Sequence, residues 1–196
     1  MIQTITIVIS FVALAVSAIT AWLTLINRGT IRMTQPTLVF FGPDGPGGSP
    51  KVFLRTLLYC TAKRGRIVEN VFIKVRRGES VQSFNIWVYG EDTLSRGSGL
   101  FVGEDGVVFN HHFLLPKDGT PYEFLAGEYL IETYAPLVGD NKPLLLSSIN
   151  LVLSESHVAA MKEKSAGVFF DWGPDSGKYH AHVDTPPYFR QSKNTK

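Results

Sequence analysis

The distribution of apolar and polar residues divides the chain into two parts. No Asp, Glu, Lys or Arg occurs before Arg28, and the interior of this first stretch is almost continuously apolar. About twenty residues, at a rise of about 1.5 Å each, cross a hydrocarbon core of roughly 30 Å. The pattern therefore predicts one transmembrane helix in residues 1–27, from about Ile5 to Ile26, and a separate domain after it.

Three alternatives compete with a spanning helix. A secretory signal peptide has basic residues before its apolar core and a cleavage site after it. Here no basic residue precedes the core, and the A-x-A sequence at Ala13–Ala15 lies in its middle. A buried helix this long and apolar on every face is unusual in a small soluble domain, and an interfacial helix needs a charged face. The spanning helix is the preferred interpretation.

Charge near the helix predicts its orientation. Arg28 and Arg32 follow the apolar stretch directly, and basic flanks tend to stay in the cytoplasm. We therefore expect the amino terminus outside and the domain in the cytoplasm. The single Cys60 agrees with a reducing compartment. A net charge of +2 and a pI of about 8.6 are too mild to predict a nucleic-acid partner.

Period-two alternation dominates the rest of the chain. After a polar connector at residues 28–35, Val71, Ile73 and Val75 share one face of a predicted strand, with Phe72 and Lys74 on the other. One segment, Ser154 to Lys164, has a helical pattern, with Ser154 or Ser156 as its cap. Glycine-rich and charged turns separate strands predicted at Thr37–Phe41, Val52–Thr61, Arg66–Arg76, Val81–Tyr89, Gly106–Leu115, Glu128–Tyr134 and Leu144–Leu153.

These elements predict a mainly β protein. Short strands at this spacing are typical of an antiparallel β-sandwich, which we place at residues 36–185, followed by a disordered tail at residues 186–196. The segment Phe124–Tyr129 contains Ala126-Gly127-x-Tyr129 before a strand. It resembles the tyrosine corner of immunoglobulin-like sandwiches, in which the tyrosine hydroxyl bonds back to the backbone. The paired cysteines of antibody domains are lacking, so the resemblance concerns architecture alone.

Two further segments carry a second resemblance. A charge-free helix leads through R-G-T-x-R-M-T-Q-P, residues 28–36, into F-F-G-P-D-G, residues 40–45. This layout is similar to that of small bacterial single-pass membrane-anchored proteins of unknown function. The resemblance implies a bacterial inner-membrane location, and it carries no activity and no functional residues.

The carboxyl-terminal part holds the most suggestive chemistry. His180 and His182 are two residues apart, so on a strand both imidazoles point to the same side, and Asp184 or another nearby aspartate could complete a metal site. The pair His111 and His112 could supply one further nitrogen, because adjacent residues of a strand face opposite ways. No spacing here matches a specific metal motif, so we favour a structural role for these histidines and predict no cofactor.

Other catalytic chemistry has little support in the sequence. Cys60 lies within a predicted strand, where a thiol usually behaves as a small buried apolar group. Ser98 lies in Gly97-Ser98-Gly99, which does not fit the G-x-S-x-G pattern of a nucleophile elbow. The glycine-rich segment 42–48 leads into a strand without the Gly-Lys-Ser/Thr of a phosphate-binding loop. We therefore predict no catalytic residues and a protein that is not an enzyme.

The helix itself offers a possible association surface. Ala13, Ser17 and Ala21 recur at every fourth residue, and small residues at this spacing let two helices approach closely. The alternative is a lone anchor whose small residues reflect ordinary membrane composition. Both interpretations stay open at this point.

Three functions follow from these features. The first is a membrane-tethered cytosolic recognition module that binds a protein or a small ligand through loops or an edge strand, with Glu91–Gly99 and Asp171–Lys178 as the loops to test. The second is a membrane effector whose helices oligomerise when the domain binds a signal. The third is a metal-dependent hydrolase that uses His180, His182 and an aspartate. The expected partners are the bilayer and a protein partner or further copies of the chain.

Overall fold

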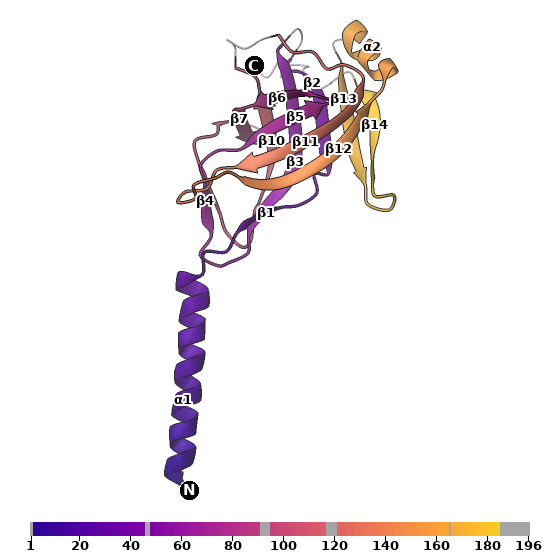
Figure 1. Ribbon diagram of the computed structural model, residues 1–196. Coiled ribbons are helices and arrows are strands. Elements are labelled where there is room, and N and C mark those ends of the chain that lie inside the picture. Colours follow the sequence, from indigo (N-terminus) through magenta and orange to yellow (C-terminus); the bar gives the residue numbers. More distant parts are fainter. Residues whose placement is uncertain (1, 46–47, 91–94, 117–120, 165, 185–196) are drawn as a thin grey trace, which may run out of the picture.

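A computed structural model describes residues 2–45, 48–90, 95–116, 121–164 and 166–184. It begins with helix α1 (Ile2–Ala21), continued by a π-helical turn at Trp22–Ile26, and this rod stands clear of a β-rich domain (Figure 1). Within these 25 residues, an 18-residue window has a mean hydropathy of 2.3. A core helix would be mostly buried, whereas no residue of α1 is buried. The segment is long and apolar enough to cross a membrane.

Hydroxyl groups in this helix bond to its own backbone. Thr6 Oγ1 donates to the Ile2 carbonyl at 3.1 Å, and Thr20 Oγ1 donates to the Val16 carbonyl at 2.8 Å. Ser10 makes the same type of bond to the Thr6 carbonyl at 2.9 Å. Because a polar group without a partner is costly in an apolar medium, these bonds make the hydroxyls compatible with a hydrocarbon surrounding.

Most of the domain is arranged in antiparallel sheets. The largest has the strand order β14-β13-β2-β3-β10-β7-β8, with β1 also paired to β3; a second has the order β12-β11-β5-β6, and a short ribbon pairs β4 with β9. The prediction of a mainly β chain with an amino-terminal apolar helix is confirmed. The strands are β1 (Ile31–Met33), β2 (Leu38–Pro43), β3 (Pro50–Cys60), β4 (Arg66–Val68), β5 (Phe72–Arg77), β6 (Ser80–Phe84), β7 (Ile86–Gly90), β8 (Ser95–Arg96), β9 (Leu100–Val102), β10 (Val107–Leu114), β11 (Gly127–Ala135), β12 (Leu144–Leu153), β13 (Gly167–Gly173) and β14 (Lys178–Asp184).

Two predicted strands are each divided in the structure. The predicted strand 66–76 becomes β4 and β5, and the predicted strand 81–89 becomes β6 and β7, which belong to different sheets. The reason is a spacing of three between buried residues. Phe84 and Trp87 are both buried, yet on one continuous strand they would face opposite sides. A break at Asn85 lets both side chains reach the core.

Several elements fall where no strand was predicted. The connector at residues 28–35 includes β1, and the carboxyl-terminal part forms the hairpin of β13 and β14. The predicted helix is present as α2 (Glu155–Lys164), and Ser154 caps it, because Ser154 Oγ accepts from the His157 amide at 3.3 Å. The predicted tail at residues 186–196 lies outside the described residues.

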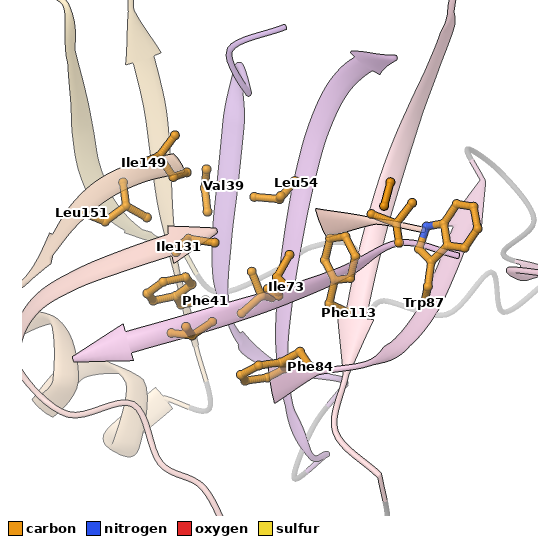
Figure 2. Close-up of a cluster of buried hydrophobic side chains, with 14 of the residues drawn as sticks. Val39, Phe41, Leu54, Ile73, Phe84, Trp87, Phe113, Ile131, Ile149 and Leu151 are labelled. Carbon is orange, nitrogen blue, oxygen red and sulfur yellow. The ribbon is translucent and has the colours of Figure 1, made fainter. Parts of the chain in front are cut away.

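The core collects side chains from both larger sheets. Figure 2 shows Val39 and Leu54 of the large sheet and Ile131 of the four-stranded sheet in one cluster. The ring of Phe41 on β2 lies 5.4 Å from that of Tyr129 on β11, measured between ring centroids. Complete burial of one such side chain stabilises a fold by about 1.5–3 kcal/mol. The shared core therefore binds the two sheets into one unit.

The tyrosine corner is formed as the sequence predicts. The Tyr129 hydroxyl donates to the Leu125 carbonyl at 2.6 Å and accepts from the Leu125 amide at 2.9 Å. Both backbone groups of Leu125 thereby find a partner inside the chain, where an unpaired group would cost stability. This bonding fixes the entry of the chain into β11.

Short contacts attach the end of the helix to the domain. The Thr30 amide donates to Thr61 Oγ1 at 2.9 Å, and the Thr61 amide donates to the Thr30 carbonyl at 3.0 Å. Arg64 Nη1 donates to the Leu25 carbonyl in the last helical turn at 3.0 Å. Gly29 has φ +61°, and a Cβ there would lie 2.7 Å from Ala62 Cβ. The helix therefore enters the domain through a tightly packed corner.

Candidate functional site

The two larger sheets leave an open side between their edge strands β12 and β14. Within the described ranges, no strand pairs with the outer side of either one. A cleft of about 430 Å³ lies between them, a size within the range of about 300–1,000 Å³ that is usual for ligand sites. The residues that line it include Gln35, Asn150, Val152, Trp172, Lys178 and Tyr179.

An aromatic pair forms one wall of this cleft. The rings of Trp172 and Tyr179 meet edge to face, with centroids 5.1 Å apart. The Tyr179 hydroxyl donates to the Pro36 carbonyl at 2.7 Å and accepts from Gln35 Nε2 at 2.9 Å. Burial raises the pKa of Tyr179 to about 12, and the hydrogen bond from Gln35 lowers this pKa by a smaller amount. The hydroxyl is therefore protonated at neutral pH, and the wall is neutral and rigid.

The backbone of β14 exposes hydrogen-bonding groups beside the cleft. The Trp172 amide of β13 donates to Thr37 at the β2 side, so alternation turns Asp171 toward β14. Asp171 is opposite His180 in the β13–β14 register. His180 therefore bonds back to β13, and the amide and carbonyl of Ala181 point away from the sheet. The backbone amides and carbonyls of Tyr179 and Val183 also point away from the sheet.

The histidines predicted as metal ligands lie on the exposed face of β14. His180 and His182 point to the same side, as predicted for a strand, and Asp184 follows on that face. His180 Nε2 lies 3.0 Å from Ser176 Oγ, and His182 Nδ1 lies 3.1 Å from Asp171 Oδ2. In the part of the chain that the structure describes, no group of three His, Cys, Asp or Glu side chains could hold a metal ion.

The other histidine pair is separated by the sheet. His111 points into the core, where its Nδ1 accepts from Trp87 Nε1 at 3.0 Å. His112 lies on the opposite face, where its ring is tilted against that of Phe53 with centroids 4.9 Å apart. Burial, aided by the neighbouring His112, lowers the pKa of His111 to about 4. Burial, aided by the charge of Lys51 and opposed by Asp44, lowers the pKa of His112 to about 4. Both rings are neutral at physiological pH.

The remaining candidates lie apart from the cleft. Cys60 is buried, and its Sγ lies 3.6 Å from the Arg28 carbonyl. Ala13, Ser17 and Ala21 are exposed on α1, which stands clear of the domain (Figure 1). Of the loop predicted at residues 91–99, residues 91–94 lie outside the described residues, whereas the loop at residues 171–178 borders the cleft through Trp172, Gly177 and Lys178.

Part of this site is not predicted by the sequence. Gln35 lies in the segment predicted as a connector, and Asn150 lies within the predicted strand Leu144–Leu153 with no sign of a binding role. The alternation of charged or polar residues with Tyr179, Ala181 and Val183 could have indicated an edge strand. No sequence signal places β12 next to β14, because their proximity depends on how the two sheets pack.

Fold and site together define a class: a mainly β protein with an exposed amino-terminal apolar helix and a cleft between two sheet edges. No protein-family model matches the chain, and no curated protein matches it. Among solved structures, the sporulation control protein Spo0M from Bacillus subtilis is similar to it. The match covers 83% of this chain and 71% of that chain at 12% identity, with a TM-score of 0.35.

Proposed function

We propose that the protein is a single-pass membrane protein whose β domain recognises an extended segment of a partner protein. The observation that carries the proposal is the edge of β14. There the backbone groups of Ala181 and its outward-facing neighbours lie beside a cleft with an aromatic wall. Peptides commonly bind by adding a strand to such an edge, with main-chain bonds for affinity and pockets for specificity.

The two faces of β14 suggest what the bound segment carries. Side chains on its cleft side would meet Tyr179, Ala181 and Trp172, which favours apolar or aromatic residues. Side chains on its other side would meet Lys178, His180, His182 and Asp184, a polar surface that favours polar residues. A small ligand could use the cleft, yet it would leave the outward amides of β14 unused. A peptide is therefore the preferred ligand.

Three further features belong to the proposal. The helix spans the bilayer with its amino terminus outside, supported by Arg28 and Arg32 at its carboxyl end. The domain is then cytoplasmic, and tethering raises its effective concentration toward partners in the same membrane. The two larger sheets form an immunoglobulin-like sandwich, supported by their shared core and by the bonds of Tyr129 to Leu125.

A backbone variant of β14 tests the recognition. The full-length protein in detergent is used to select binders from a library of short unstructured peptides, and fluorescence anisotropy then gives their Kd. Ala181→Pro removes an outward amide without removing a bond to β13, and proline is tolerated on edge strands. The peptide carbonyl that would accept from the Ala181 amide then has no partner. Binding should weaken about tenfold or more, since an unpaired buried group costs about 1–3 kcal/mol.

The matched control is Ala181→Ser, which retains the amide and should weaken binding much less than Ala181→Pro does. Trp172→Ala tests the cleft wall and should also weaken binding. Equal affinity of the Ala181→Pro and wild-type proteins would contradict strand addition at β14. If the wild-type protein selects no peptide at all, the proposed recognition is wrong.

A further inference from the structure

A row of exposed apolar side chains crosses the β4–β9 ribbon. Ile67 on β4 is directly opposite Phe101 on β9. On the other side of β4, the Val138 amide donates to the Ile67 carbonyl at 3.0 Å, next to a bridge between Val68 and Leu137. The three side chains therefore share one face, and they are 48%, 59% and 49% exposed for Ile67, Phe101 and Val138. We call them the basal apolar row.

This row lies close to the end of the helix. A Cβ at Gly65 would lie 2.4 Å from Phe101 Cζ, so the ring covers that glycine. The preceding residue, Arg64, is bonded to the Leu25 carbonyl in the last helical turn. Figure 1 shows β4 at the end of the domain that adjoins α1. A chain of direct contacts thus connects the helix end to Phe101.

Helix length and composition bring this end of the domain to the bilayer surface. The 25 residues of Ile2–Ile26 extend about 37 Å at about 1.5 Å each, which exceeds a hydrocarbon core of about 30 Å. A helix that is longer than the hydrocarbon core tilts in the bilayer. A tilt toward β4 brings the β4–β9 ribbon closer to the bilayer surface. Trp22 is 52% exposed near the helix end, at a position typical of residues in the headgroup region.

The charge at this end is mixed. Lys63 and Arg64 are exposed in the turn before β4, whereas Glu104 and Asp105 are exposed in the turn after β9. Arg66 is already paired with Asp140 at 2.7 Å. Net charge alone therefore does not select a partner, and the apolar row must provide most of the contact. Its chemistry, apolar side chains flanked by exposed charges of both signs, matches the headgroup region of zwitterionic lipids.

We propose that the basal apolar row lies in the headgroup region of the membrane that holds α1, with Lys63 and Arg64 against lipid phosphates. The inference rests on the proposed spanning helix. The contact restricts rotation of the domain about the helix. It also keeps the cleft between β12 and β14 at a defined height above the bilayer. Recognition then occurs in a fixed orientation rather than on a freely turning tether.

An environment-sensitive fluorophore on Phe101→Cys tests the contact. The full-length protein is reconstituted in phosphatidylcholine vesicles that contain lipids with a spin label near the headgroup, and Cys60 is buried from the reagent. We expect a blue-shifted emission and quenching severalfold stronger than for Val152→Cys. Val152 is 61% exposed on β12, near its junction with α2, and is the matched control.

Two additional measurements sharpen the result. Adding phosphatidylglycerol should increase quenching at position 101, and Lys63→Glu, which leaves the bond from Arg64 to the Leu25 carbonyl in place, should reduce that increase. Flotation of the vesicles separates the two proposals. If the protein does not float with the lipid, the spanning helix is wrong; if it floats but position 101 is quenched no more than position 152, the contact is wrong. Quenching removed only by an added protein would indicate a protein partner for the row and overturn the proposal.

Discussion

Three consecutive side chains of β10 contain buried polar atoms that have no hydrogen-bond partner among the described residues. These atoms are Asn110 Oδ1, His111 Nε2 and His112 Nδ1. Unpaired buried groups cost stability, so a fold retains them only where surrounding packing compensates. His111 is the clearest case, because it is 2% exposed and lies among the rings of Trp87, Phe109 and Phe113. Protonating this ring would place an uncompensated charge in the core.

This burial predicts that stability falls in mild acid. The pKa of His111 is about 4 in the folded protein and about 6.5 in an unfolded chain. The unfolded state therefore binds more protons between these two pH values. The stability that the neutral His111 ring contributes is complete above pH 6.5 and is lost as the pH falls toward 4. At pH 5 the loss from His111 is on the order of 2 kcal/mol. Urea unfolding at pH 7 and pH 5 measures it.

The control for this prediction is His111→Gln, which can still accept from Trp87 Nε1 but does not titrate. It should be less stable at pH 7 and should lose less stability between pH 7 and pH 5 than the wild type. An unchanged pH dependence in this variant would assign the acid sensitivity to other groups, His112 among them.

The large sheet depends on two glycines beneath one ring. Phe40 of β2 is buried on the outer face of the sheet, where its ring pairs with Phe169 of β13 at 4.8 Å. Gly42 and Gly167 lie under the ring, and a Cβ at either would come within 2.4 Å of it. The absence of a side chain at these positions lets Phe40 lie flat across β2 and β13. Strand pairing next to the β14 edge thereby depends on small residues.

We predict that Gly167→Ala destabilises the domain by about 1–3 kcal/mol, the usual cost of overpacking. The new Cβ would lie 1.9 Å from Phe40 Cε2 and would force the ring to move. Thermal unfolding measures the effect. Gly103→Ala is the matched control, since the nearest atom to its Cβ lies 3.8 Å away. A Phe40→Leu background should reduce the cost of Gly167→Ala, and an equal loss for both alanine variants would contradict the steric explanation.

The complete chain combines a membrane-length helix with a domain that is packed directly onto its end. The contacts of Thr30 with Thr61 and of Arg64 with Leu25 leave little free linker between them. In the proposed single-pass arrangement, the orientation of the helix decides which compartment the cleft faces. The proposal places the cleft in the cytoplasm on the basis of Arg28 and Arg32, close to this junction.

A protease-protection measurement checks this orientation. With an epitope tag at the carboxyl terminus of the full chain expressed in bacteria, the tag should resist protease added to spheroplasts. It should be removed once the cells are lysed, because the membrane no longer shields a cytoplasmic domain. A known periplasmic protein, degraded in both conditions, is the control. Removal of the tag before lysis would place the domain outside and reverse the assignment.

Local patterns in the sequence determine much of this protein. The charge-free stretch before Arg28 is sufficient to predict an apolar helix that is long enough to cross a membrane. Alternation identifies strands such as β11 and β12, because the period of two survives wherever one face is buried. It also places His180 and His182 on one side of a strand, and the motif around Tyr129 predicts its bond to Leu125.

Tertiary packing decided the rest. The breaks between β4 and β5 and between β6 and β7 depend on which residues reach the shared core, and Phe84 and Trp87 show this only once both sheets are in place. Likewise, the cleft requires β12 and β14 to be edges of different sheets, although 24 residues separate the end of one from the start of the other. Periodicity records burial along one strand and contains no information about which strand becomes its neighbour.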